Sequence, residues 1–174
     1  MKKIVLIFLV IVMVAGFSNK VVAQTTAIAS ATATATIIAP IAISKTGTDL
    51  SFGNVIKGAG TIVVAPAGTR SGTAALLPGA QAGTVTAAVF TVTGEGSNTY
   101  AITLPSTDYT ITNTTGSGGE TMIVNVFTST PSATGTLTSG TQELRVGATL
   151  NVTAGQVSGV YTNATGFDVT VNYN

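Results

Sequence analysis

The sequence has no cysteine, no histidine and no tryptophan among its 174 residues. Without cysteine, disulfide bonds, thiol nucleophiles and thiolate metal ligands are excluded. Without histidine, the commonest general base of enzymes is also missing. Ser71 stands in the sequence Gly-Thr-Arg-Ser-Gly, which is not a nucleophile elbow, and no imidazole exists to activate it. The absence of tryptophan makes a platform for stacking on sugar rings poor.

Charge is also scarce, since 7% of the residues are charged where ordinary globular domains carry about 25%. Beyond residue 23, four cations stand against six carboxylates, a net charge of −2. Such a chain has no basic patch for nucleic acid. Its carboxylates are too scattered for a catalytic pair or a calcium loop. We therefore expect no enzyme activity, no cofactor, no bound metal and no nucleic-acid partner.

The N-terminal residues have the pattern of a secretory signal peptide. Two lysines precede the apolar run 4–15, and short side chains at 21–23 suit a signal peptidase. The run is shorter than the ~20 residues that cross a bilayer. We expect a cleaved signal peptide at residues 1–23 and no membrane span after cleavage. The protein is then exported to the periplasm, the outer cell surface or the extracellular space.

The rest of the chain is rich in Thr, Ser, Asn and Gly and shows short alternating runs bounded by turn residues. Threonine is β-branched, which favours strands over helices. The pattern predicts an all-β fold in one domain over residues 24–174, an antiparallel β-sandwich, immunoglobulin-like or pilin-like, with roughly nine to eleven short strands. Residues 94–98 are expected to join two of them as a hairpin. The expected strands are residues 29–38, 41–44, 49–55, 61–65, 85–93, 99–104, 109–113, 122–128, 143–152, 159–162 and 166–173.

Two segments are candidates for assembly strands. In the first, residues 29–38, alanine and threonine alternate, so that one face is narrow and the other polar. We interpret it first as an edge strand of its own sheet and, as the alternative, as an arm donated to a neighbouring subunit. In the second, four apolar side chains of the C-terminal segment share one face. The candidate residues are Ala31, Thr32, Ala33, Thr34, Ala35, Thr36, Ile37, Ile38, Phe167, Val169, Val171 and Tyr173.

Three stretches carry a resemblance to a known family: LSFGNV at 50–55, TGEGSNTYAITLP at 93–105 and FDVTVNY at 167–173. With them the chain resembles the secreted bacterial family catalogued as domain of unknown function 4402. That resemblance implies a small exported β-protein with no established activity. The last strand, with its penultimate Tyr173, is also similar to the last strand of spore-coat-U and chaperone–usher pilin subunits. This second likeness implies assembly by β-strand addition.

These observations favour an exported, non-enzymatic structural or adhesive surface protein, with copies of itself or related subunits as partners. The alternative is a monomeric extracellular module that binds glycans or surface polymers. In that case tyrosines would supply contacts, and the candidates are Tyr100, Tyr109 and Tyr161.

Overall fold

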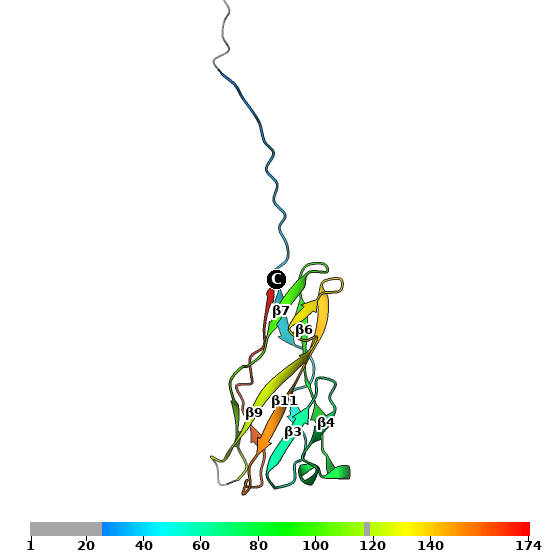
Figure 1. Ribbon diagram of the computed structural model, residues 1–174, viewed down its shortest axis with the longest axis vertical. Coiled ribbons are helices and arrows are strands. Elements are labelled where there is room, and N and C mark those ends of the chain that lie inside the picture. The colour runs from blue at the N-terminus through cyan, green and yellow to red at the C-terminus, as the bar shows by residue number, and fades with distance from the viewer. Residues whose placement is uncertain (1–25, 117–118) are drawn as a thin grey trace, which may run out of the picture. The chain divides into compact units, whose positions relative to one another are not determined.

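The computed structural model describes residues 26–116 and 119–174, and the signal peptide expected at residues 1–23 lies outside them. The compact unit Ile37–Asn174 contains every strand of the described chain (Figure 1). All strand pairs are antiparallel, so the expected all-β class is confirmed. The strands are β1 (Ala42–Lys45), β2 (Ser51–Phe52), β3 (Gly60–Val64), β4 (Arg70–Gly72), β5 (Val85–Thr86), β6 (Ala88–Thr93), β7 (Thr99–Thr103), β8 (Tyr109–Asn113), β9 (Thr121–Thr130), β10 (Thr134–Thr136), β11 (Thr141–Val152), β12 (Tyr161–Thr162) and β13 (Thr170–Tyr173).

Strand β11 is the longest and has three partners in the large sheet. Along one edge it pairs first with β6, from Thr141 opposite Thr93 to Val146 opposite Ala88. It then pairs with β3 through residues 148–152. Strand β9 follows the other edge. The eight-stranded sheet therefore runs in the order β1-β6-β11-β9-β8-β12, with β3 and β4 attached beside β11.

Gly147 lies on β11 where β6 gives way to β3. A Cβ atom added there would meet the carbonyl oxygen of Val64, together with backbone atoms of Ala65 and Pro66 at 2.8 and 2.9 Å. Next to it, the Arg145 Nε donates a hydrogen bond to the Pro66 carbonyl at 2.8 Å. The close approach of β3 to β11 thus requires a residue without a side chain at this point.

The first hydrophobic core lies between the large sheet and a three-stranded sheet in the order β10-β7-β13. Tyr100 of β7 is fully buried in it (0% exposed). Its hydroxyl donates to Gln142 Oε1 at 2.7 Å, and the same oxygen accepts the Thr136 N–H at 2.9 Å. The buried members of this core are Ala88, Val92, Tyr100, Leu137, Leu144, Val146 and Val171.

The second core lies under the other half of β11, where the three-stranded sheet does not reach. Its cover consists of the two-stranded sheet β2-β5 and the 3-10 helix η1 (Ala74–Leu76); a second such helix, η2 (Gly79–Gln81), follows. The buried members are Ile62, Leu76, Val124, Ala148, Leu150 and Val152. Because one large sheet is covered by two small ones, the broader description, an antiparallel all-β fold, is the one we keep.

The structure corrects two local expectations. The hairpin predicted around residues 94–98 is wrong, because β6 pairs with β1 and β11 while β7 pairs with β10 and β13. The connection passes from one sheet to the other, and Gly94 lies against Tyr173, where a Cβ would meet the tyrosine hydroxyl. The strand number is also higher than expected, because β4 and β10 are short strands inside segments rich in turn residues.

Replacing Gly147 by alanine should destabilise the fold strongly. The new methyl group meets backbone atoms of β3 that cannot move without breaking the ladder, and we expect a cost of about 3 kcal/mol or more. Gly79 is the matched control, because nothing lies within 4 Å of its Cβ position and its φ is +55°. Gly79→Ala should cost about 1–2 kcal/mol. Urea unfolding measures the loss of unfolding free energy in both variants. Equal losses would contradict the conclusion that the approach of β3 to β11 requires glycine at residue 147.

Candidate functional site

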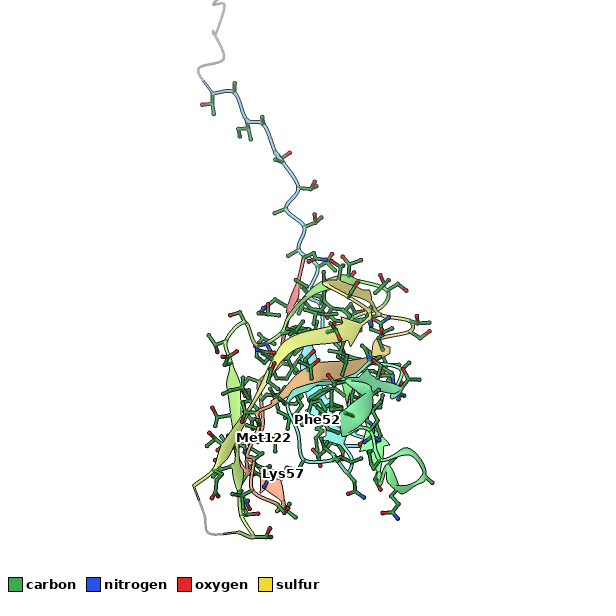
Figure 2. All side chains as sticks on the ribbon, turned by 60° about the horizontal axis from the view of Figure 1, so that its bottom comes forward. Phe52, Lys57 and Met122 are labelled. Carbon is green, nitrogen blue, oxygen red and sulfur yellow. The ribbon has the colours of Figure 1, made fainter. Side chains whose placement is uncertain are left out.

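The candidate site is an open cleft of about 1110 Å³ over the second core. That volume is slightly above the usual range of small-molecule pockets, which is about 300–1,000 Å³. Its floor is formed by apolar side chains of β8, β9 and β11, and two irregular segments, residues 53–57 and 156–167, form its walls. Figure 2 shows Phe52 of β2, Lys57 of the wall 53–57 and Met122 of the floor near one another. The floor residues are Tyr109, Ile111, Met122, Val124, Leu150 and Val152.

The first wall follows β2 and is held from the side away from the cleft. The N–H groups of Asn54 and Ile56 donate to the Ala82 and Leu76 carbonyls at 2.7 and 2.9 Å. Arg70 Nη1 donates to the carbonyls of Phe52 and Asn54, each at 2.8 Å. In an extended chain, successive backbone groups point to opposite sides. The N–H and C=O of Val55 therefore face the cleft, and no hydrogen bond joins them to another described residue.

The second wall is held by its own polar side chains. Gln156 Nε2 donates to the Thr121 carbonyl and to the Tyr161 hydroxyl, both at 3.0 Å. The Tyr161 hydroxyl in turn donates to the Val157 carbonyl at 2.6 Å. Asn163 Nδ2 donates to the Thr110 carbonyl at 2.9 Å. These hydrogen bonds hold the loop against β8 and β9, so the role of these polar groups is structural.

Aromatic rings close one end of the cleft. Phe167 packs edge-on against Tyr109 and Phe90, with ring centroids 6.1 and 6.4 Å apart. It also lies 4.9 Å from Phe127. Phe127 belongs to a β-bulge of β9, where the register on β11 shifts between Gly147 and Thr149. The bulge places Val126 at φ 48° and turns the following ring inward.

Of the three tyrosines proposed as glycan contacts, one is buried and two line the cleft. Tyr100 is fully buried, so the expectation that it contacts a ligand is wrong. Burial raises the pKa of its hydroxyl. Burial also raises the pKa of Tyr109, where a hydrogen bond with the Gly166 backbone opposes the shift and the charge of Asp168 adds to it. Tyr161 lines the cleft, with its hydroxyl bonded as described above.

The charged side chains of the described residues are dispersed over the surface. Lys45 and Asp49 form an ion pair of 2.6 Å at the rim of the cleft, and both side chains are exposed to solvent. Exposed pairs of this kind contribute little to stability. Asp108 accepts a hydrogen bond from the Asn125 amide at 3.0 Å. Within residues 26–116 and 119–174, no three His, Cys, Asp or Glu side chains are grouped so that they could hold a metal ion.

The N-terminal candidate segment is extended and exposed. Residues 26–40 belong to no strand, so the strand expected at residues 29–38 is not formed within the described chain. The physical reason is that their small side chains gain little from burial. Three isoleucines of the segment are exposed to 89% (Ile28), 97% (Ile37) and 48% (Ile38). The named residues Ala31, Thr32, Ala33, Thr34, Ala35 and Thr36 are all exposed.

The C-terminal candidate segment has a different position. Its apolar side chains alternate with exposed ones, as expected, and they pack into the first core. Only the last part is a strand, β13, which pairs with β7. The face formed by Phe167, Val169, Val171 and Tyr173 is therefore already packed within the unit, with Val171 buried and the other three half-buried. Of the two candidate segments, only the N-terminal one has a free face.

The comparisons with known proteins agree with the resemblance. The family model described as Domain of unknown function (DUF4402) matches residues 41–173. The chain belongs to this family. No curated protein and no solved structure matches it. In the part of the chain that the structure describes, no helix is both long and apolar enough to cross a membrane. The matched region begins at β1, so residues 26–40 precede it.

The buried Tyr100 and the half-buried Tyr109 predict a loss of stability in alkali. Their pKa values are raised above the usual 10.0, so the folded protein holds these protons more tightly than the unfolded chain. The stabilisation is complete below about pH 10 and decreases as the pH rises through the folded pKa. Urea unfolding at pH 8 and pH 11 should show a smaller decrease for Tyr109→Phe than for the unaltered protein. Tyr100→Phe should also show a smaller decrease. If the free energy of unfolding falls as much in both variants as in the unaltered protein, the raised tyrosine pKa values are not its cause.

Proposed function

We propose that this protein is an exported, non-enzymatic structural subunit of the cell surface that associates by β-strand addition through residues 26–40. The observation that carries the proposal is the exposure of this alternating segment beside a unit that is compact without it. An extended segment with unpaired backbone groups is suited to add a strand to a neighbouring sheet. The predicted signal peptide supports export.

The low charge of the chain supports the same proposal. Charged side chains on edge strands are a main protection against edge-to-edge pairing. Residues 26–40 contain none. The apolar side chains of Ile28 and Ile37 are almost fully exposed, and a monomer would gain from removing them from water, at about 25 cal/mol per Å².

The base of the segment is anchored at one end of the unit. The Tyr173 hydroxyl donates to the Ala39 carbonyl at 3.0 Å, and the Ala39 N–H donates to the Glu95 carboxylate at 3.2 Å. The Glu95 N–H donates in turn to the Tyr173 hydroxyl at 2.6 Å. This triad ties the end of β13 to the segment and fixes the point at which the arm leaves the unit. We call residues 26–38 the arm from here on.

A second candidate function is favoured by the cleft itself. Its size and its polar rim would suit a glycan or surface polymer bound by a monomer. Saturable binding of such a polymer to the monomeric protein, lost in a Thr165→Trp variant that narrows the cleft, would support this module. A glycan array without binding would count against it.

Proline in the arm should weaken self-association without affecting the fold. Ala33→Pro removes a backbone donor and is poorly accommodated in a β-ladder, while residue 33 is exposed in the unit. We expect association to weaken at least about tenfold, or about 1.4 kcal/mol. Sedimentation velocity over a concentration series measures this change, with the melting temperature unaltered.

Ala33→Thr is the matched control, because threonine is a strand former that keeps all backbone groups. It should associate like the unaltered protein. If the processed protein remains a monomer at its highest soluble concentration, or if Ala33→Pro associates normally, assembly through the arm is wrong.

A further inference from the structure

We propose that the cleft of one copy is the acceptor for the arm of the next copy, so that subunits join head to tail. This inference rests on the proposed function and names its binding site. Three features of the described residues support it: the backbone groups on the cleft wall, the apolar floor, and the positions of the arm's anchor and of the cleft on the unit.

The first wall presents a strand edge to the cleft. Hydrogen bonds from Asn54 and Ile56 occupy the outer side of residues 53–57, and the Val55 backbone faces the cleft. An incoming extended segment can pair with this edge and would continue the small sheet β2-β5 across the second core. The added strand would supply the cover that this core lacks and that the three-stranded sheet gives to the first core.

The floor is apolar and belongs to the second core. Three of its residues are already almost completely buried, with exposures of 2% (Val124), 3% (Leu150) and 5% (Val152). A strand laid over this floor needs an apolar face, and a face made mostly of small side chains lets its backbone approach the floor closely. The odd-numbered face of the arm meets this requirement, because it is formed by Ala27, Ala29, Ala31, Ala33, Ala35 and Ile37. Its even-numbered face carries Ser30 and the threonines, with Ile28 and Ile38 near its two ends, and is the more polar of the two faces.

The anchor of the arm, Ala39 with Glu95 and Tyr173, and the cleft lie at opposite ends of the unit. Strand β11 begins at Thr141, opposite Thr93 and near the arm anchor, and ends at Val152 in the cleft. Eleven steps of about 3.3 Å give roughly 36 Å between them. The C-terminus, next to the anchor, and strand β3 are likewise far apart in Figure 1. The arm spans roughly 43 Å when extended, so an arm folded back on its own unit would place only its first few residues in the cleft.

A contact between unlike ends generates an open chain of subunits. Each copy has one arm and one cleft, and its arm does not occupy its own cleft. Such heterologous contacts produce filaments unless the rotation between subunits closes a ring. The expected product is therefore a fibre, with the first copy of each fibre keeping an empty cleft.

A pair of charge substitutions tests which face of the arm enters the cleft. Ala33→Glu places a carboxylate on the face directed at the apolar floor, and Thr34→Glu places the same charge on the solvent face. We expect Ala33→Glu to weaken association at least about tenfold and Thr34→Glu to change it by less than about threefold, measured by sedimentation. Equal effects of the two variants would overturn the orientation and with it the argument from the floor.

Disulfide trapping locates the acceptor, because the natural chain has no cysteine. The probe is the full chain, exported and processed, with Ala33→Cys combined with Lys57→Cys at the cleft. The matched controls combine Ala33→Cys with Ser44→Cys on the free edge of β1 or with Ser71→Cys on β4. We expect a ladder of disulfide-linked oligomers on a non-reducing gel for the cleft pair and only traces for the two controls.

The other outcomes separate the two proposals. A ladder from the β1 or β4 pair instead of the cleft pair leaves assembly through the arm standing and overturns the cleft as its acceptor. Disulfide-linked monomers from the cleft pair would show that the arm binds its own unit, which overturns the head-to-tail contact. Absence of any oligomer in sedimentation and on the gel would overturn both proposals.

Discussion

The backbone ladder of β11 is the interaction on which the rest of the structure depends. In twelve residues this strand pairs with β6, β3 and β9, and both hydrophobic cores lie against it. Gly147 makes the arrangement possible, because β3 can approach β11 only where no side chain intervenes. In a protein without disulfide bonds and with few ion pairs, this ladder and its two cores must supply most of the stability.

The same strand explains why the unit has a cleft. Its first half is covered by a complete three-stranded sheet, and its second half by the two-residue strands β2 and β5 and a short 3-10 helix. The second core is thus less fully covered on the side between residues 53–57 and 156–167. The second core lacks a covering strand at the cleft, and the arm is an extended segment without a partner in the described chain. Addition of the arm of one copy to the cleft of another would satisfy both.

Much of the fold could be predicted from the alternation of apolar and polar residues. The all-β class and the inward face of Phe167, Val169 and Val171 follow from a period of two, which depends on local sequence. The passage of the chain from the large sheet at β6 to the three-stranded sheet at β7 could not be predicted. It depends on the packing of Tyr173, which is distant in sequence, against Gly94. The arm has the same period as a strand, but whether it finds a partner in its own unit depends on packing that no local pattern encodes. The cleft escaped prediction for a similar reason, since its walls are about a hundred residues apart.

The measurement that tests the central claim most directly compares the processed protein with a form that begins at Ile41, by sedimentation velocity and thermal melting. We predict that the intact protein forms concentration-dependent oligomers and that the shortened form is a monomer with nearly the same melting temperature. A shortened form that unfolds or melts far lower would show that residues 24–40 complete the subunit's own fold. That result, or a strictly monomeric intact protein, would contradict the account.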